Sequence, residues 1–338
     1  MTSDTAPTLQ DVARAAGVST ATISRSINDP DKVAKPTRDR IQHAIDTLGY
    51  TPNFGAKVLA SNRTNTVGAV IPSMANAMFA SGLQAFQEVL SEAGVTLLVA
   101  STSYDPDQEL RQIKSLIAHG ASGLMLIGTD RPQTTKDFLA LRRVPHVISW
   151  CYADDPDQLF AGFDNVQAAY QMTQSVLAHG HRQIAMIAGI SAHNDRARAR
   201  ITGVQAAIRD HGGTATLTQV VEARYRLEHG AEAYAQIMAG EDWPTAIICG
   251  NDVLAAGAMT QARRDGVSVP EDVSIVGFDD IGIATVLAPQ LTTVRVPQIE
   301  MGRAAAELLL ARLADTAPVH SIRLDTQVVM RETLGAID

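Results

Sequence analysis

Residues 8–28 read TLQDVARAAGVSTATISRSIN, in which two short helical patterns flank a Gly-Val-Ser turn. The first pattern places apolar residues at i, i+3, i+4 and i+7, the spacing of one helix face: Leu9, Val12, Ala13 and Ala16. Thr8 with Asp11 resembles a capping box, and Gly17 suits a left-handed helix end. Ser19 can cap the helix that follows. The stretch therefore predicts two helices joined by a tight turn.

The second helix has one apolar side and one side of small polar residues. Ile23 and Ile27 face inward, whereas the other side carries Thr20, Ala21, Ser24, Arg25 and Asn28. A third helix is expected after Pro36, capped by Thr37 and ended by Gly49. Such helices could also belong to the surface of a larger domain. The tight turn, the small alanines and the outward Arg and Asn favour a helix-turn-helix, whose second helix can enter the major groove of DNA.

These residues closely resemble the headpiece of the lactose-repressor (LacI-type) family of bacterial regulators. The family pattern reads roughly T-L-x-D-V-A-x-x-A-G-V-S-x-x-T-V-S-R-x-L-N, and the chain departs from it by conservative changes such as Ile23. We expect the headpiece to contact DNA through Thr8, Ser19, Thr20, Ala21, Thr22, Ser24, Arg25 and Asn28. Base reading should fall to Thr20, Ala21 and Arg25, with Arg25 opposite a guanine.

The resemblance continues through residues 48–53 and the segment 54–62. In the family this segment is a hinge that becomes a short helix when two subunits meet on operator DNA. A helix of about eight residues is marginal alone in water, because nucleation is unfavourable. The resemblance implies DNA contacts at Asn53, Ala56 and Leu59, with Leu59 as a wedge in the minor groove. From its residue type alone, Leu59 would be a buried packing residue.

Length and composition bound the rest of the chain. Its 338 residues exceed one typical domain, and 46% hydrophobic residues suffice for sizeable cores. We find no apolar run of about eighteen residues and no basic-then-apolar start, so we expect no membrane partner and a cytoplasmic protein. Cys151 and Cys249 lack metal or redox spacing and are expected in cores.

The net charge of −8 is unevenly distributed along the chain. Residues 1–65 hold eight Lys/Arg against six Asp/Glu, so the headpiece is mildly basic and the rest is acidic. Because phosphate neutralisation dominates nonspecific binding, one headpiece should bind DNA weakly and act as one of a pair.

From residue 66 onward, short apolar runs alternate with helical stretches. The runs lie at 67–71, 96–100, 123–127, 146–149, 183–188, 246–249 and 273–278. This alternation predicts parallel sheets covered by helices, in two similar lobes. The resemblance implies a periplasmic-binding-protein-like core whose lobes are joined by three crossovers.

The predicted fold class is therefore α/β, with a three-helix headpiece, a hinge and a two-lobed core. We place the headpiece at 1–53, the hinge at 54–65 and the core at 66–338. Within the core, the first lobe takes about 66–165 and 297–324, and the second about 166–293 and 325–335.

Ligands of parallel sheets bind beyond the carboxyl ends of the strands and in clefts between lobes. Aromatic, amide and charged residues follow the predicted strands, a set suited to a small polyhydroxylated effector: Ser73, Phe79, Trp150, Asn194, Arg196, Arg200, Tyr225, Asn251 and Asp279. The resemblance matches Arg200 to the effector-binding arginine and Asp279 to the carboxylate that accepts effector hydroxyls or amines. Trp150 stands where several relatives carry Asp, which alters the pocket.

Other charged residues in these segments have structural interpretations. For Arg196 and Arg198, a solvated helix face or salt bridges are as well supported as contact with a ligand. Asp252 and Asp280 are expected to cap helices or brace loops. Asp279 and Asp280 could be read as acid/base machinery, but adjacent residues of an extended segment point to opposite sides.

Three classes of function compete: a regulator, a solute-binding protein serving transport, and an enzyme. A solute-binding protein would be expected to have a signal peptide and to lack a helix-turn-helix. For an enzyme we find no nucleotide-binding glycine motif, no Gly-x-Ser-x-Gly and no His-Glu-x-x-His, and the nine histidines lack ligand spacing. We therefore expect neither catalysis nor a metal or cofactor, and predict an effector-controlled transcriptional regulator.

The most direct interpretation is a repressor of carbohydrate-utilisation genes that binds a pseudo-palindromic operator as a homodimer. No heptad tail follows Arg331, which favours a dimer over a tail-joined tetramer. Residues 71–73 and 161–173 weakly resemble gluconate-responsive members, which hints at a sugar acid, although a neutral sugar fits nearly as well. A corepressor-dependent regulator answering to a non-sugar metabolite is the alternative.

Overall fold

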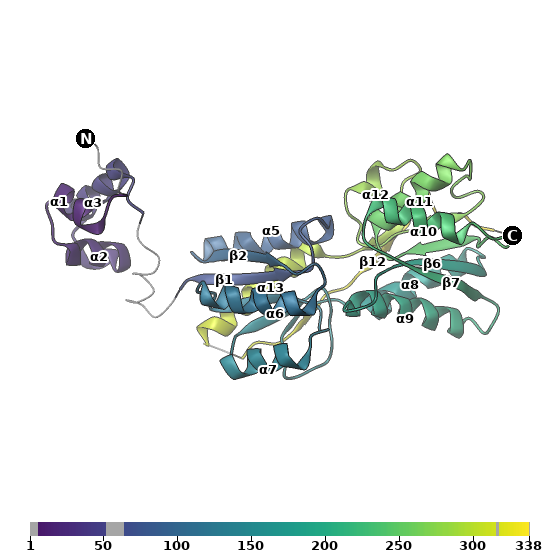
Figure 1. Ribbon diagram of the computed structural model, residues 1–338, viewed down its shortest axis with the longest axis horizontal. Coiled ribbons are helices and arrows are strands. Elements are labelled where there is room, and N and C mark those ends of the chain that lie inside the picture. Colours follow the sequence, from purple (N-terminus) through teal and green to yellow (C-terminus); the bar gives the residue numbers. More distant parts are fainter. Residues whose placement is uncertain (1–5, 52–63, 316–317, 338) are drawn as a thin grey trace. The chain divides into compact units, whose positions relative to one another are not determined.

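The computed structural model describes residues 6–51, 64–315 and 318–337. The chain divides into two compact units, residues 1–64 and residues 65–338. Both are drawn in Figure 1, and each is described by itself below.

The first unit is a small helical headpiece. It contains α1 (Leu9–Ala16), α2 (Thr20–Asn28), a short 3-10 turn (Pro30–Lys32) and α3 (Lys35–Leu48). Thr8 and Asp11 form the predicted capping box on α1, Gly17 ends that helix at φ 64°, and Ser19 caps α2 by accepting from the Thr22 N–H. Its core is built from Val12, Ala13, Ala16, Ile23, Ile41 and Ala44.

The start of the third helix differs from the prediction. We expected Thr37 to be its cap, but α3 begins at Lys35, and its N-cap Ala34 makes no side-chain capping bond. Pro36 therefore lies in the first turn, where its missing N–H has no helical partner to lose. Gly49 ends the helix at φ 62°, as predicted.

The first lobe of the larger unit is a parallel sheet in the order β11-β5-β4-β3-β1-β2. Its strands are β1 (Thr66–Ile71), β2 (Thr96–Ser101), β3 (Gly123–Ile127), β4 (His146–Ser149), β5 (Phe160–Gly162) and β11 (Ile322–Arg323). Its helices are α5 (Ala77–Glu92), α6 (Pro106–Ala118), α7 (Gln133–Arg142) and α13 (Gln298–Ala314). Strands β1 and β3 are buried along their whole length, because helices cover both faces of the sheet.

The second lobe has a parallel sheet in the order β7-β6-β8-β9. Its strands are β6 (Gln183–Gly189), β7 (Thr216–Ala223), β8 (Ala246–Cys249) and β9 (Ser274–Val276). The helices of this lobe are α8 (Asn165–Ala178), α9 (Asp195–Asp210), α10 (Leu227–Ile237), α11 (Asp252–Arg264) and α12 (Ile283–Val286). An antiparallel pair, β10 (Thr293–Arg295) and β12 (Gln327–Val329), completes it.

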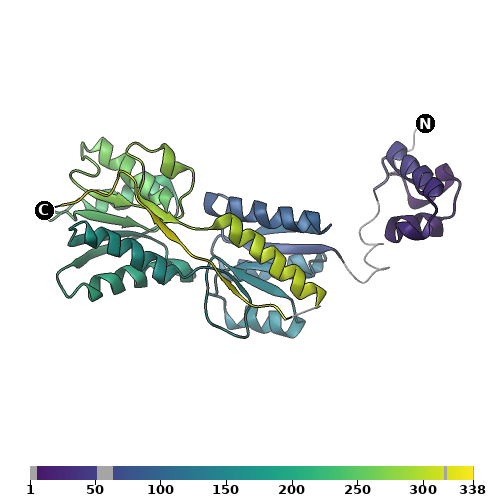
Figure 2. The ribbon, with the colours of Figure 1, turned by 180° about the vertical axis from the view of Figure 1, so that it is seen from behind.

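The chain passes between the lobes at three places. It crosses from β5 to α8, returns from β10 to α13, and crosses again from β11 to β12. Helix α13 packs against α5, so a segment near the C-terminus completes the first lobe (Figure 2). The two lobes are therefore linked by three connecting segments.

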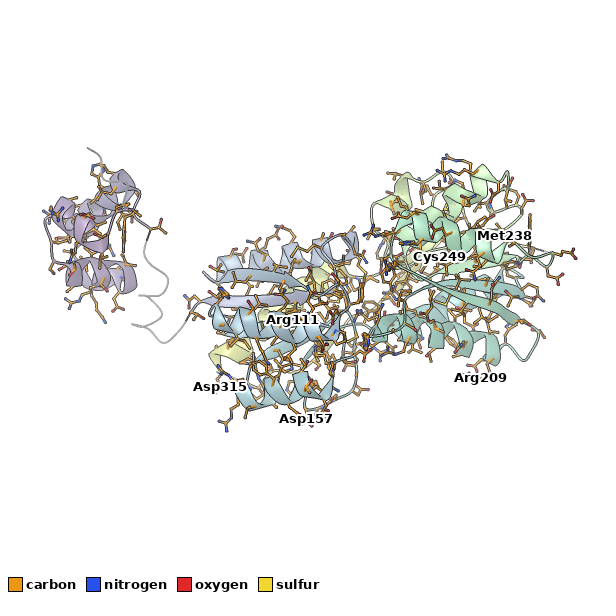
Figure 3. All side chains as sticks on the ribbon, in the orientation of Figure 1. Arg111, Asp157, Arg209, Met238, Cys249 and Asp315 are labelled. Carbon is orange, nitrogen blue, oxygen red and sulfur yellow. The ribbon has the colours of Figure 1, made fainter. Side chains whose placement is uncertain are left out.

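The hydrophobic cores agree with the sequence pattern. Cys151 and Cys249 are both buried and free, as expected for packing residues. Figure 3 shows Cys249, Met238 and Arg209 in the second lobe and Arg111 and Asp157 in the first. Among the described helices, none combines the length and the apolar composition needed to cross a membrane.

Candidate functional site

The headpiece exposes one polar face on α2. Ile23 is fully buried, whereas Thr20, Ala21 and Arg25 are exposed on the same helix. These exposed residues lie at spacings of one, four and five along the chain, which places them on one side of a helix. The side chain of Asn28 lies outside the described part of the structure. Arg25 is thus presented in the manner that major-groove reading requires.

Most headpiece cations are already engaged by nearby acids. Arg14, Lys32, Lys35 and Arg38 each lie 3.1 to 3.4 Å from an aspartate of the headpiece. Arg25 has no ion-pair partner among the described residues. A guanidinium without an intramolecular partner can form bidentate hydrogen bonds with a base edge or a phosphate.

The other predicted DNA contacts have mixed placements. Thr8 and Ser19 are exposed, and both serve as helix N-caps. Thr22 and Ser24 are partly buried, with the Thr22 hydroxyl 2.9 Å from that of Ser19. The three predicted contacts toward the hinge, Asn53, Ala56 and Leu59, lie outside the described residues.

A cavity of about 570 Å³ opens between the two lobes of the core, at the carboxyl ends of β1, β2, β6 and β7. Three predicted effector residues line it: Ser73, Asn194 and Tyr225. The remaining lining residues were not predicted from sequence: Ala75, Asn76, Ser103, Tyr104, Ile190, Ala192, Arg224 and Arg226. Each follows a strand closely, so the strand-end rule could have found them.

The amides of the cavity wall cap two long helices. The Asn76 side chain accepts from the Met78 N–H and caps α5, and the Asn194 side chain accepts from the Ala197 N–H and caps α9. Asn194 also donates to the Tyr225 hydroxyl at 3.3 Å. The cavity therefore faces the N-terminal ends of two helices, where the helix dipole is positive.

A buried charged network centred on Arg200 lies outside the lining of this cavity, so the predicted effector residues Arg200, Asn251 and Asp279 do not line it. The lining residue Tyr104 is close enough to interact with the charges of Arg200 and Asp279. The Nε of Arg200 donates to the Asn165 side chain at 3.0 Å, and another nitrogen donates to the Gly250 carbonyl. The guanidinium stacks on the Phe278 ring at 3.7 Å and lies 3.6 Å from the Asp279 carboxylate. Asn165 in turn donates to the Trp150 carbonyl, which ties the network to the first lobe.

Asp279 is the least satisfied member of this network. Neither carboxylate oxygen has a hydrogen-bond partner among the described residues, although the residue is 1% exposed. Burial raises the pKa of Asp279 to about 7, against the opposing effect of Arg200. Its backbone has φ 114°, a region that non-glycine residues rarely occupy. Such strain and an unpartnered carboxylate are typical of a ligand site.

Asn251 and Trp150 add two further polar atoms without partners. The Nδ2 of Asn251 and the Nε1 of Trp150 are buried and make no hydrogen bond within the described part of the chain. The Oδ1 of Asn251 caps α11 by accepting from the Leu254 N–H. A buried donor without an acceptor is unfavourable, so a ligand that supplies acceptors would satisfy both groups.

Phe79 and Trp150 pack together in the core of the first lobe. Their ring centroids are 5.3 Å apart in an edge-on arrangement, and both are almost fully buried. A Cβ at Gly82 would lie 2.7 Å from the Trp150 ring, so the indole requires glycine at that position of α5. Neither aromatic residue lines the cavity itself, and their ligand roles remain predictions.

Asp195, the partner of Arg196, joins the two lobes. The Arg196 guanidinium pairs with Asp195 at 2.7 Å, and Asp195 accepts from the Thr129 N–H at 2.6 Å and its hydroxyl at 3.0 Å. Burial alone would raise the pKa of Asp195, but Arg196 and the bonds from Thr129 hold it below its usual value. Arg198 pairs with Asp130 at 2.6 Å. The first turns of α9 are therefore fastened to the β3–α7 loop of the other lobe.

Asp252 and Asp280 brace loops, as predicted. Asp252 accepts from the Ile281 N–H at 2.8 Å and from the Thr293 hydroxyl, while Asp280 pairs with Arg295 and Arg331. Our reason for separating Asp279 from Asp280 was wrong. The segment is not extended, because both residues have positive φ, and the turn directs the two carboxylates to different partners.

Comparison with known proteins agrees with this geometry. Residues 8–53 match the family of bacterial regulatory proteins, lacI family, and residues 173–334 match a periplasmic binding protein-like domain. The HTH-type transcriptional repressor PurR of Photobacterium profundum is 31% identical over 332 residues, covering 97% of this chain and 98% of its own. The chain belongs to the lacI family of bacterial regulatory proteins.

Solved structures support the lacI-family fold. The Lac repressor dimer bound to operator and the anti-inducer ONPF has a TM-score of 0.84 at 26% identity, covering 98% of this chain and 100% of its own. A complex of the transcriptional regulator CelR with cellobiose has a TM-score of 0.69 at 29% identity, covering 97% of this chain and 99% of its own. The predicted fold class and family are thereby confirmed, and the relative PurR is named a transcriptional repressor.

Proposed function

We propose that this chain is a sequence-specific transcriptional repressor whose operator affinity is set by a small molecule bound between the core lobes. The exposed face of α2, with Arg25 free of ion pairs among the described residues, is the observation that carries the DNA-binding part. The domains are a headpiece at 1–53, a hinge at 54–65 and an effector core at 66–338. Base reading falls to Thr20, Ala21 and Arg25.

The effector part of the proposal is carried by the buried Arg200–Asp279 pair, whose charges act on Tyr104, a lining residue of the inter-lobe cavity. An unpartnered buried carboxylate accepts hydrogen bonds from ligand hydroxyls, and unpartnered amide and indole N–H groups donate to ligand oxygens. This mixture suits a polyhydroxylated ligand, and a sugar or a sugar acid is proposed. The related regulator solved with cellobiose supports a carbohydrate. Carbohydrate-utilisation genes are accordingly the proposed targets.

A homodimer in the cytoplasm, acting on a pseudo-palindromic operator, is the proposed working form. A related repressor has been solved as a dimer on operator, and twofold protein symmetry is matched by twofold symmetry in the DNA site. The headpiece is only mildly basic, so two copies are needed for strong binding. Asn53, Ala56 and Leu59 are proposed to contact the minor groove at the centre of such a site.

Control is proposed to act through the populations of two core conformations. The lobes are joined by three crossings and by the contacts of α9 with the β3–α7 loop, so closure around a ligand changes their relative orientation. A ligand shifts operator affinity by the difference between its affinities for the two conformations. An inducer prefers the conformation that releases DNA, and a corepressor prefers the one that binds it.

The test combines operator selection with ligand response. Full-length protein is used to select sites from random double-stranded DNA, and binding to the enriched site is measured by fluorescence anisotropy with and without sugars and sugar acids. We expect an enriched inverted repeat, and at least one compound that changes its affinity. Asp279→Ala should abolish that change while leaving operator binding intact. Enrichment of no sequence would refute the DNA-reading part, and a retained response in Asp279→Ala would move the effector site elsewhere.

A further inference from the structure

The charged residues that line the inter-lobe cavity are all of one sign. Arg224 and Arg226 line it, and no aspartate or glutamate is among its described lining residues. Arg226 pairs with Glu228 at 3.5 Å. Arg224 is exposed and has no ion-pair partner among the described residues. The cavity therefore carries one cation without an intramolecular counter-charge.

The nearest acidic residue along the strand forms no ion pair with Arg224 in the described structure. Glu222 lies two residues earlier and is engaged elsewhere, accepting from the Ser191 N–H at 3.0 Å and from its hydroxyl at 2.6 Å. The buried Asp279 faces Arg200, so that pair adds no net charge when both are ionised. Among the lining residues, the uncompensated charge is consequently that of Arg224, to which the helix ends add.

Two helix N-termini add to this positive field. The N-caps of α5 and α9, both sixteen-residue helices, are lining residues of the cavity. The first turn of α5 contains no acidic residue, and the acid in the first turn of α9, Asp195, is engaged by Arg196 and Thr129. Backbone N–H groups and the dipole at such ends favour an anion.

Asn76 supplies an independent observation that points to a ligand. It is 5% exposed and borders the cavity, and its Nδ2 has no hydrogen-bond partner in the described structure. Its Oδ1 is already used to cap α5, so the group left available is a donor. A buried donor without an acceptor is satisfied when a ligand brings an oxygen atom.

We propose that the effector carries an anionic oxygen group, carboxylate or phosphoryl, bound by Arg224 and Asn76, with Arg224 selecting it over the neutral sugar. This rests on the proposed function in taking the cavity as the effector site. The 570 Å³ volume suits a ligand the size of a monosaccharide acid or phosphate. The anionic group would lie toward Arg224, and the rest of the ligand would face the other lining residues.

Matched ligand pairs test the anion directly. Gluconate is compared with glucitol, which has a hydroxymethyl group in place of the carboxylate, and glucose 6-phosphate with glucose. Glucuronate, galacturonate and inorganic phosphate complete the panel. Thermal midpoints and calorimetric affinities are measured on the full chain, because a ligand of the native state raises the midpoint. We expect at least one anion to bind and its neutral partner to bind at least tenfold more weakly; the responding arm tells carboxylate from phosphoryl.

Variants assign the selectivity to residues. Arg224→Ala should lower the affinity for the anion about tenfold to a hundredfold, the range for losing a hydrogen bond to a charged group. The affinity for neutral sugars should not change. Arg224→Lys should restore part of the affinity for the anion. Asn76→Asp keeps the helix cap and places a second anion at the site, so it should also weaken binding. Arg209→Ala, an exposed arginine elsewhere in the same lobe (Figure 3), is the charge-matched control and should have no effect.

The outcomes separate this proposal from the general one. Equal binding of neutral partners, no response to any anion of the panel, or unchanged affinity in Arg224→Ala would overturn it. If a neutral sugar binds and changes operator affinity, the proposed function is supported and the proposal that the effector carries an anionic group is contradicted. An anion that binds through Arg224 without changing operator affinity would support the anion site and remove the proposed control of DNA binding.

Discussion

The carboxylate of Asp279 lies 3.6 Å from the guanidinium of Arg200, too far for a hydrogen bond between them. Arg200 is held in place by Asn165, the Gly250 carbonyl and the Phe278 ring instead. Asp279 is held by its own backbone, whose N–H donates to the Val294 carbonyl at 2.8 Å. Two rigidly held opposite charges thus stand slightly apart in a buried site, and a ligand hydroxyl can complete the contact.

This arrangement predicts a specific pH dependence of stability. Burial raises the pKa of Asp279 to about 7 from an unfolded value of 3.8, so the folded protein holds a proton that the unfolded chain has lost. The free energy of unfolding should therefore fall as the pH rises through this window and level off above it. Asp279→Asn removes the titration. The difference in thermal midpoint, wild type minus variant, should shrink or become negative between about pH 5 and about pH 8.

The measurement is a thermal scan of both proteins in ligand-free buffers of constant ionic strength. Other titrating groups are shared, so they cancel in the difference between wild type and variant. Parallel curves for the two proteins across this range would show that Asp279 is ionised throughout and that Arg200 compensates it fully.

The sequence was sufficient for the fold because its signals are local. The headpiece is defined by local features, without any long-range contact. These are the apolar spacing of i, i+3, i+4 and i+7, the helix ends at Gly17 and Gly49, and the cap at Ser19. In the core, apolar runs such as β1 and β3 are buried on both faces, a pattern that indicates parallel sheets. Thr37 does not cap α3, because the helix begins at Lys35 and Thr37 therefore lies within its first turn.

The cavity could be predicted in part. Ser73, Asn194 and Tyr225 followed from the strand-end rule, but three other lining residues were missed. Asn76 lies three residues after Ser73, and Arg224 immediately precedes Tyr225. Tyr104 follows β2, a strand after which no site residue was predicted. Which of several neighbouring side chains faces a cleft depends on how the two lobes meet, and that contact is not local in sequence. For the same reason Arg196 could not be assigned, since its partner Asp195 is held by Thr129 of the other lobe.

Arg25 should govern discrimination between operator and random DNA. Arg25→Ala should lower operator affinity about tenfold to a hundredfold, the effect of losing one bidentate base contact, with a much smaller change on random DNA. Arg40→Ala removes the same charge from an exposed residue of α3 and should weaken both DNAs similarly. Anisotropy titrations at one fixed salt concentration measure this. Equal losses on the two DNAs for Arg25→Ala would make it a phosphate contact.

Gly82 should be intolerant of a side chain. A Cβ there would lie 2.7 Å from the Trp150 ring and 2.8 Å from the Gln298 carbonyl, between α5 and α13. Gly82→Ala should lower the free energy of unfolding by about 1–3 kcal/mol through overpacking. Gly240→Ala is the matched control, because nothing lies within 4 Å of its Cβ position. Urea unfolding measures both variants, and equal stabilities would mean that both the indole and the backbone of α13 at Gln298 move aside.

The two contacts of α9 with the other lobe should differ in strength. Asp195 and Arg196 have side chains 17% and 6% exposed, whereas Asp130 and Arg198 are 31% and 46% exposed. Asp195→Ala leaves a buried guanidinium without its carboxylate and should destabilise the core by about 3 kcal/mol or more. Asp130→Ala breaks a solvated pair and should lose less than about 1 kcal/mol. Urea unfolding of the full chain compares them. Similar losses would show that the lobes are held by the exposed pair as much as by Asp195, and that Arg196 finds another partner when Asp195 is removed.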